Sequence, residues 1–206
     1  LQHSVMARPS FKRWWTKIVP EALERSTYVL FSCLAVIVLM WQWRPIDIVV
    51  WTVENSAMRS ALHALFAIGW AMVPAVSLLI NHFDLFGTRQ VWLHFKGRKY
   101  SPLKFRTPGV YAHVRHPLYV GWTIAFWATP TMTLGHFVLA VLLTGYMLAA
   151  IPLEERDLIA FHGDKYRQYR RLVPAMLPRL GGRSTGGRRD RELTDDASTT
   201  LTTQGA

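Results

Sequence analysis

Cysteine is nearly absent from this sequence of 206 residues, and charged residues are few. The single cysteine, Cys33, excludes a disulfide framework, a zinc site built on cysteines and a redox-active cysteine pair within the chain. Charged residues make up 18% of the chain and apolar residues 50%, which excludes a chain that is disordered throughout. The first residues show no signal-peptide pattern and start at Leu1 rather than at a methionine, so we expect further sequence upstream.

Charge is missing altogether from three long stretches, which are residues 26–43, 60–83 and 116–153. About 20 apolar residues cross a bilayer as a helix, so the first two stretches suit one crossing each. The third is long enough for two, and Pro130 interrupts it where a turn would bring the chain back, which predicts a helical hairpin. Its first arm, residues 116–128, is short. A shallow or tilted hairpin is therefore an alternative, as is a soluble helical bundle with a very apolar core.

The distribution of the 24 lysines and arginines indicates membrane orientation rather than nucleic-acid binding. They lie between the apolar stretches, with five at residues 8–25, seven at 89–115 and ten from 156 onward. Basic loops stay in the cytoplasm, so we expect both ends of this chain there. A nucleic-acid protein would instead carry a basic stripe on one folded face. The sequence predicts an all-α, polytopic membrane protein with about four membrane helices, of which the last two form the hairpin.

The segments outside the apolar stretches differ in composition. Residues 81–115 form a polar, basic connection that is too long for a passive loop, and we expect it to bind or catalyse. After the hairpin, helical spacing of apolar residues with a break at Gly163-Asp164 predicts two short amphipathic helices at the membrane surface. Residues 179–206 are polar and predict a disordered tail behind a membrane domain that covers residues 1–178.

Ionisable and hydrogen-bonding residues collect where the two ends of the hairpin meet. They are Arg106, Tyr111, His113, Arg115, His116 and Tyr119 before the hairpin, and Glu154, Glu155, Arg156 and Asp157 after it. A carboxylate pair beside arginine and histidine makes a half-buried pocket with charges of both signs, which is typical of a functional site. The alternative is that these residues form salt bridges and extend toward the headgroups at a helix end.

Two smaller patterns lie in the same region. His113 and His116 are three residues apart and could face one metal ion, but no third ligand is evident. We therefore expect no metal and favour proton transfer as the role of either histidine. Four aromatic residues could surround a sulfonium or ammonium cation, or form an aromatic belt at the membrane interface; they are Tyr111, Tyr119, Trp122 and Trp127.

Two blocks of sequence flank the hairpin. The first is VRHPLYVGW at residues 114–122; the second begins with EERDL at 154–158 and continues with GDKY at 163–166 and VPAMLP at 173–178. In this order they resemble the isoprenylcysteine carboxyl methyltransferase superfamily of integral membrane enzymes. The resemblance covers roughly residues 100–178.

Other segments are similar to a narrower family, the methanethiol S-methyltransferases. They are QHSVMARP at residues 2–9, WQWRP at 41–45, NHFDLFG at 81–87 and FWATPTMT at 126–133. The similarity implies transfer of a methyl group from S-adenosylmethionine to methanethiol, giving dimethyl sulfide and S-adenosylhomocysteine. It also implies a cofactor-binding part at about 81–178 and a further membrane helix upstream. We expect a bacterial inner membrane, with the active site facing the cytoplasm.

The superfamily also implies roles for individual residues. Its cofactor pocket is lined by a tyrosine five residues before the His-Pro pair, by the His-Pro-x-Tyr residues and by the first glutamate of the glutamate pair. These roles fall on Tyr111, His116, Pro117, Leu118, Tyr119 and Glu154. The prenylcysteine enzymes hold a carboxyl substrate with an arginine four residues before that glutamate, where this chain has Ala150. The difference argues against a carboxylate acceptor and fits a small neutral thiol.

The expected chemistry is an in-line displacement that requires a thiolate. We expect His116 or His113 to accept the thiol proton and Arg106 or Arg115 to bind the cofactor's carboxylate. A small volatile thiol would enter from the lipid and the charged cofactor from the cytoplasm. Nucleic acid is not an expected partner, and the oligomeric state is open. Two alternatives remain: a methyltransferase of the same superfamily acting on another thiol or a lipid-linked acceptor, and a non-enzymatic protein whose basic loops bind anionic lipid.

Overall fold

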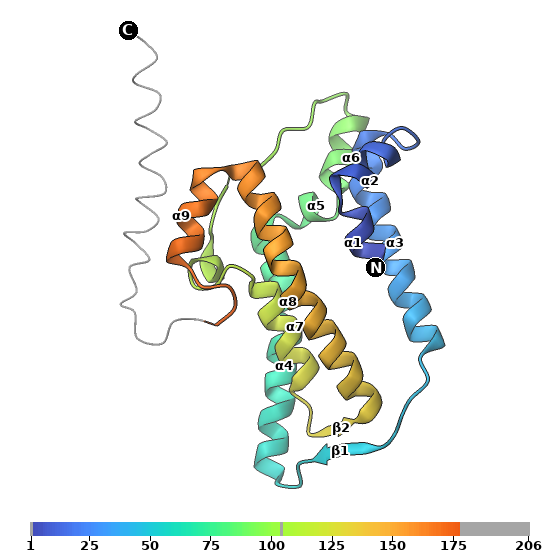
Figure 1. Ribbon diagram of the computed structural model, residues 1–206, viewed down its shortest axis with the longest axis vertical. Coiled ribbons are helices and arrows are strands. Elements are labelled where there is room, and N and C mark those ends of the chain that lie inside the picture. Colours follow the sequence, from blue (N-terminus) through green and yellow to red (C-terminus); the bar gives the residue numbers. More distant parts are fainter. Residues whose placement is uncertain (1, 104, 178–206) are drawn as a thin grey trace.

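Helices make up most of the computed structural model, which describes residues 2–103 and 105–177 (Figure 1). In chain order they are α1 (Gln2–Met6), α2 (Pro9–Trp15), α3 (Glu21–Gln42), α4 (Ser56–Ile80), α5 (His82–Leu85), α6 (Thr88–Phe95), α7 (Pro117–Trp127), α8 (Leu134–His162) and α9 (Asp164–Leu172). A 3-10 turn, η1 (Gly109–Ala112), precedes α7, and two short strands are β1 (Val49–Thr52) and β2 (Thr131–Thr133). α7 contacts both α4 and α8, while α3 packs against α1 and α6.

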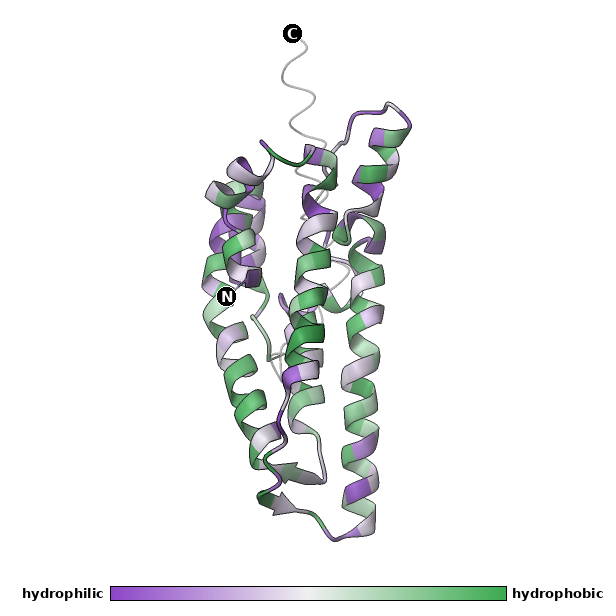
Figure 2. Cartoon of the chain, turned by 90° about the vertical axis from the view of Figure 1, so that its right-hand side faces the viewer, coloured by the Kyte–Doolittle hydropathy of each residue, from purple (hydrophilic) through white to green (hydrophobic). Residues whose placement is uncertain are grey.

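Three helices are long and apolar enough to cross a membrane. They are α3 with 22 residues, α4 with 25 and α8 with 29. Within their most apolar windows only 6%, 17% and 17% of the residues are buried, so most of the apolar side chains face outward. Figure 2 shows that hydrophobic residues predominate along the long helices. Such surfaces suit lipid and contradict the alternative of a soluble bundle, and the predicted all-α membrane protein is confirmed.

α7 and α8 form the predicted hairpin, with the turn at Pro130. The first arm, α7, has 11 residues. It covers about 17 Å, so it is too short to cross a bilayer alone. β2 holds the turn by pairing antiparallel with β1, with Val49 opposite Thr133 and Thr52 opposite Thr131.

Glycines bring α7 into close contact with α4. A Cβ atom at Gly69 would lie 2.7 Å from the backbone nitrogen of Ala125 and 2.9 Å from the carbonyl oxygen of Gly121. Small residues allow membrane helices to approach closely in this way. The contact fixes the position of α7, and with it the residues at the start of that helix.

Replacing Gly69 with alanine is therefore expected to separate α4 from α7 and to destabilise the protein by about 1–3 kcal/mol, because backbone atoms cannot move aside as a side chain can. Thermal unfolding in detergent measures this loss. Gly145 on α8 is the matched control, since an added Cβ there would meet no atom within 4 Å. Equal unfolding temperatures for Gly69→Ala and Gly145→Ala would contradict the tight contact.

α8 continues to His162, so the first of the two predicted amphipathic helices is the last part of α8 rather than a separate helix. Pro152 lies inside α8 without ending it. The predicted break occurs at Gly163, whose φ of 63° suits glycine, and α9 follows as the second amphipathic helix. The small core beneath α9 consists of Tyr166, Tyr169 and Val173, with Phe105, Leu158, Ile159 and Leu172 packed against it. The expected tail at 179–206 lies outside the described residues.

The connection after α4 forms α5 and α6 and docks on α3. Arg25 Nε donates a hydrogen bond to the carbonyl oxygen of Leu85 at 2.9 Å. Gly87 approaches α3 so closely that a Cβ atom would lie 2.7 Å from the backbone nitrogen of Ser26. This docking places α3 and α1 on the far side of the molecule from α4 and α7 (Figure 1).

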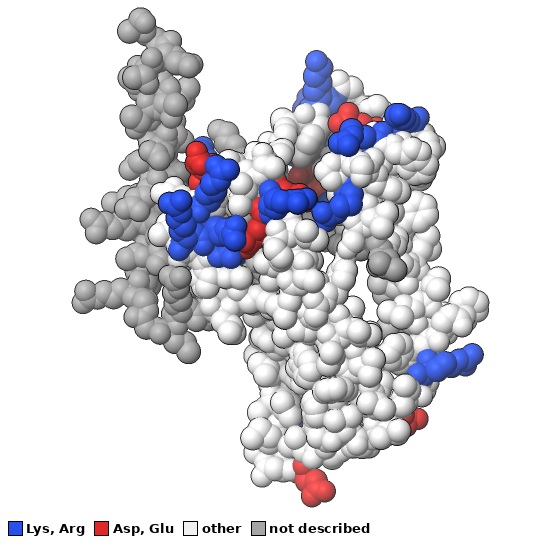
Figure 3. All heavy atoms as spheres, in the orientation of Figure 1, with Lys and Arg blue, Asp and Glu red and all other residues white. Residues whose placement is uncertain are grey.

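Charge is distributed unevenly over the surface. Figure 3 shows Lys and Arg mainly over the part of the molecule that holds α2, α6 and α9, while the long helices below it are mostly uncharged. The few charged residues at the opposite end are Arg44, Asp47, Glu54 and Arg59, in and around the connection that contains β1. The basic loops therefore gather at one end of the molecule, and the membrane orientation predicted from them stays a prediction.

Candidate active site

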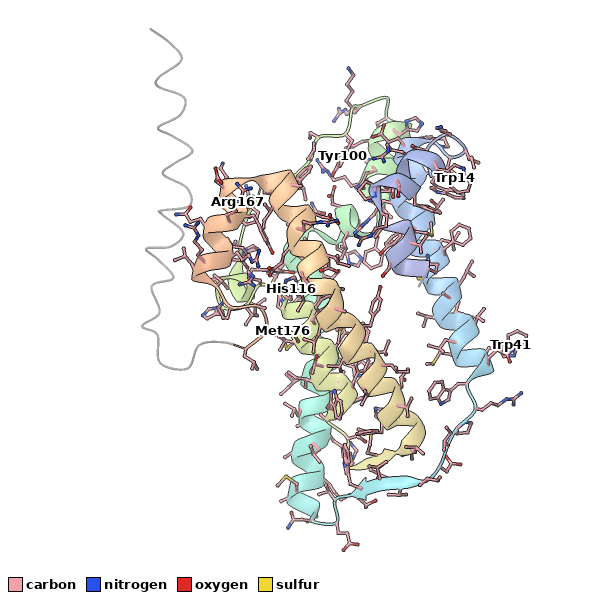
Figure 4. All side chains as sticks on the ribbon, in the orientation of Figure 1. Trp14, Trp41, Tyr100, His116, Arg167 and Met176 are labelled. Atoms are coloured by element: carbon pink, nitrogen blue, oxygen red, sulfur yellow. The ribbon has the colours of Figure 1, made fainter. Side chains whose placement is uncertain are left out.

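The hairpin brings residues at the start of α7 next to residues near the end of α8. His116 and Arg115 come directly before α7, and Glu154 and Glu155 lie on α8. The chain after α9 closes over this junction, because the backbone N–H groups of Arg115 and His116 donate to the carbonyl oxygens of Pro174 and Ala175, each at 2.9 Å. In Figure 4, His116 lies at the level where α7, α8 and α9 meet.

Glu155 is the most buried charged residue of the site, with 2% of its surface exposed. Its Oε1 accepts from Arg115 Nε at 2.7 Å, and its Oε2 lies 2.9 Å from Arg170 Nε. A buried carboxylate requires such partners, because an unpaired charge in a low-dielectric interior is costly. Glu155 thus joins the hairpin to α9.

His116 lies between the two glutamates and is 8% exposed. Its Nε2 is 3.2 Å from Glu155 Oε1, which accepts the hydrogen of that nitrogen. Its Nδ1 faces Glu154 Oε2 at 3.7 Å. In the tautomer that donates from Nε2 to Glu155, Nδ1 is the nitrogen that can accept a proton.

Glu154 is the exposed member of the pair, with 41% of its side chain accessible. Its Oε1 accepts a hydrogen bond from the Tyr119 hydroxyl. The Tyr119 ring stacks on His116, with the ring centroids 5.4 Å apart. Glu154, Tyr119 and His116 therefore form one continuous polar surface.

Arg115 holds the last turn of α9 in place. Besides its pair with Glu155, its guanidinium donates to the carbonyl oxygen of Arg170 at 3.0 Å and to that of Val173. Only 10% of its side chain is exposed. These contacts occupy the donors that were expected to bind a cofactor carboxylate, and they favour a positioning role for Arg115.

Tyr111 lies beside α9, where the Tyr169 hydroxyl donates to its backbone carbonyl at 2.6 Å. Burial raises the pKa of the Tyr111 hydroxyl to about 12, and that of Tyr166 to about 12 as well. Both hydroxyls therefore stay neutral throughout the physiological pH range. Pro117 is fully buried and Leu118 half-buried at the start of α7.

The structure does not bring every candidate residue to this junction. His113 and Arg106 are exposed, and within residues 2–103 and 105–177 their side chains take no part in the contacts around His116.

The aromatic residues of the possible cation cage do not surround a common space either. Trp122 packs on Trp70 of α4, with ring centroids 5.1 Å apart, and Trp127 donates through Nε1 to Thr144 Oγ1 at 3.0 Å. Among the described residues, no group of three or more His, Cys, Asp and Glu could hold a metal ion.

Some residues of the site could not be identified from sequence reasoning. Glu155 was part of the charged cluster, but its adjacency to Glu154 gave no sign that it alone is buried. Arg170 and Tyr169 lie on α9, and their only signal was the helical spacing of the amphipathic segment. Their contacts depend on how α9 folds back.

Comparison with known proteins identifies the family. The family model described as a protein of unknown function (DUF1295) matches residues 8–173. The methanethiol S-methyltransferase of Crocosphaera subtropica is 55% identical over 184 residues, which is 89% of this chain and 72% of that protein. The methanethiol S-methyltransferase of Mycobacterium tuberculosis is 53% identical over 178 residues, covering 86% and 73% of the two chains. The chain belongs to the methanethiol S-methyltransferase family.

The match to the family model extends over most of the described chain. The region matched by the family model contains α2 to α9 and every site residue from Arg106 to Arg170. Nurim of Bos taurus is also similar, at 30% identity over 166 residues, which is 76% of this chain and 63% of that protein. No solved structure matches the chain.

Proposed function

We propose that this chain transfers the methyl group of S-adenosylmethionine to methanethiol, giving dimethyl sulfide and S-adenosylhomocysteine. The observation that carries the proposal is the polar surface at the hairpin junction, where His116 lies between the buried Glu155 and the exposed Glu154. The names of relatives that are 53% and 55% identical support methyl transfer to methanethiol. The distribution of basic residues supports a site that faces the cytoplasm, at the inner membrane of a bacterium.

The residues present at the junction fit the cofactor. S-adenosylmethionine supplies an electrophilic methyl group on a sulfonium, and it also carries an ammonium and a carboxylate. Glu154 offers a carboxylate for the ammonium or for the ribose hydroxyls. For the cofactor's carboxylate we assign Arg106, whose exposed side chain lies outside the junction, rather than Arg115, whose donors are engaged within it. Aromatic faces attract cations, so the face of the Tyr119 ring opposite His116 suits a cationic sulfonium.

His116 is the base that the geometry favours. Glu155 fixes its Nε2–H and stabilises the imidazolium that forms when Nδ1 accepts the thiol proton. The sulfur lone pair then forms the new bond to the methyl carbon, while the electrons of the broken bond remain on the cofactor sulfur. His113 is exposed to solvent and less suited to this role.

Replacing Glu154 with glutamine is expected to weaken cofactor binding by about tenfold to a hundredfold, since a hydrogen bond to a charged group contributes about 1.5–3 kcal/mol. Equilibrium binding of S-adenosylmethionine to the membrane-inserted protein measures the change. Glu21→Gln, at the start of α3, removes one carboxylate away from the hairpin and serves as the control. Equal affinities for both variants would remove Glu154 from the cofactor site.

The acceptor is tested by product analysis. Membranes that contain the protein are given S-adenosylmethionine and a panel of thiols of increasing size, and the volatile and non-volatile methylated products are identified by mass spectrometry. We expect methanethiol to be turned over with the highest kcat/KM. Preference for a larger thiol or for a lipid-linked acceptor would assign a different substrate within the same reaction class, and absence of S-adenosylmethionine binding would favour a non-enzymatic role in binding anionic lipid.

A further inference from the structure

Three side chains with hydroxyl groups, from three different helices, lie close to one another. They are Ser4 on α1, Tyr28 on α3 and Tyr146 on α8, and we call them the hydroxyl cluster. Ser4 Oγ and the Tyr146 hydroxyl are 2.7 Å apart, although 142 positions separate them in the sequence. Tyr28 is 8% exposed and lies near enough to Tyr146 and Glu154 to interact with them electrostatically. Tyr119 interacts in the same way with Tyr146 and Tyr28.

The cluster lies deeper along the hairpin than the charged residues. Tyr146 precedes Glu154 by about two turns of α8, toward the turn at Pro130. Tyr28 and Tyr146 both belong to helices that are long and apolar enough to span the membrane. Polar groups at such positions are costly in lipid, and they gather mainly where a polar part of a substrate has to be bound.

α1 completes this arrangement. It lies between α3 and α8 (Figure 1), and Ser32 Oγ of α3 donates to Gln2 Oε1 at 3.4 Å. Below α1 the surface is hollowed between α3 and the hairpin (Figure 3). A small apolar molecule that is dissolved in the membrane can therefore approach the cluster from the side.

We infer that the hydroxyl cluster is the subsite for the acceptor thiol; this inference rests on the proposed function. Phenol hydroxyls donate hydrogen bonds to a thiolate sulfur and so stabilise it, while the aromatic rings pack favourably against sulfur and its methyl group. The Arg25 guanidinium lies over the Tyr28 ring, 5.3 Å from its centroid, and a positive charge beside the cluster favours the thiolate over the neutral thiol. In this arrangement the cofactor binds on one side of Glu154, and the thiol binds at the hydroxyl cluster on the other side.

The contacts of Glu154 also provide a route for the proton. Its Oε1 accepts from the Tyr119 hydroxyl and its Oε2 faces His116 Nδ1. The S–H bond of the thiol breaks as the Tyr119 hydroxyl takes its proton and gives its own to Glu154 Oε1. Rotation of the protonated carboxyl group then brings that proton to His116 Nδ1, and the sulfur keeps the electron pair that attacks the methyl carbon. The exposed edge of Glu154 allows the proton to leave for the cytoplasm after the transfer.

The test compares Tyr146→Phe and Tyr28→Phe with Tyr100→Phe, in the full chain in membranes. Tyr100 lies in the connection after α6, and its hydroxyl donates a hydrogen bond to Asp84 of α5. Figure 4 shows Tyr100 well away from His116, so this control loses one hydroxyl-mediated hydrogen bond outside the site. We expect the KM for methanethiol to rise about tenfold in the two cluster variants, with S-adenosylmethionine affinity unchanged. The difference in KM for methanethiol between these variants and the wild type should shrink as pH rises, because the thiol then ionises without help from the protein.

Two results would overturn the subsite. One is a thiol KM and a pH profile equal to those of Tyr100→Phe; the other is an equal loss of cofactor and thiol binding, which indicates a structural role. Calorimetric binding of methanethiol to the protein loaded with S-adenosylhomocysteine separates this inference from the proposed function. Weaker binding in Tyr146→Phe supports the subsite even if the wild type produces no dimethyl sulfide, and unchanged binding refutes it.

Discussion

Replacing His116 with alanine is expected to lower kcat/KM for methanethiol by about 10²–10⁴, the usual contribution of a general base. The variant removes the imidazole that lies between Glu154 and Glu155. Its Nε2 contacts the buried Glu155, and its Nδ1 faces Glu154. Affinity for S-adenosylmethionine should change much less, since Glu154 and Arg106 remain. Initial rates of dimethyl sulfide formation at several thiol concentrations, together with equilibrium cofactor binding, measure both quantities.

Two other histidines make this experiment specific. His94 on α6 is exposed and far along the chain from the hairpin, so His94→Ala controls for the loss of an imidazole. His113→Ala separates the two bases that the sequence allows. A severe loss in His113→Ala with normal rates in His116→Ala would reverse the assignment and contradict the geometry described above.

Replacing Glu155 with glutamine is expected to destabilise the protein by about 3–5 kcal/mol and to abolish turnover, because the buried guanidinium of Arg115 would lose its carboxylate. Arg170 would lose the same partner, so α9 should separate from the hairpin. The tautomer of His116 would also no longer be fixed, because the glutamine amide can donate as well as accept. Unfolding in detergent and limited proteolysis at α9 measure the structural effect.

The neighbouring residue provides a matched control for stability. Glu154→Gln makes the same substitution one position earlier, on the exposed side of α8. The unfolding temperature of this variant should therefore stay close to that of the wild type. Equal destabilisation of the two variants would show that burial does not distinguish Glu155 from Glu154. An active, stable Glu155→Gln protein would contradict the role given to the buried cluster.

The membrane fold could be predicted from sequence because its signals are local. Long charge-free stretches predicted α3, α4 and the hairpin, and Pro130 gave the position of the turn. The continuous course of α8 was less evident. Its polar last turns have the composition of a separate surface helix, and only the absence of a break before Gly163 shows that they extend the membrane helix.

The site was predictable only in part, for a physical reason. His116, Tyr119 and Glu154 lie in short motifs, and the hairpin brings these motifs together. The burial of Glu155 depends on Arg115 and on α9, which returns from beyond Gly163. Such contacts arise from tertiary packing and leave no spacing that a sequence can reveal. The 2.7 Å contact of Ser4 with Tyr146, across 142 positions, is the clearest example.

The central claim is that this chain moves a methyl group from S-adenosylmethionine to methanethiol. The most direct test supplies membranes containing the protein with methanethiol and S-adenosylmethionine whose transferable methyl group carries three deuterium atoms, and analyses the gas phase by mass spectrometry. The account predicts dimethyl sulfide with one deuterated and one ordinary methyl group, at a rate proportional to the amount of protein and lost in His116→Ala. Absence of labelled dimethyl sulfide from protein that is inserted and binds the cofactor would contradict it.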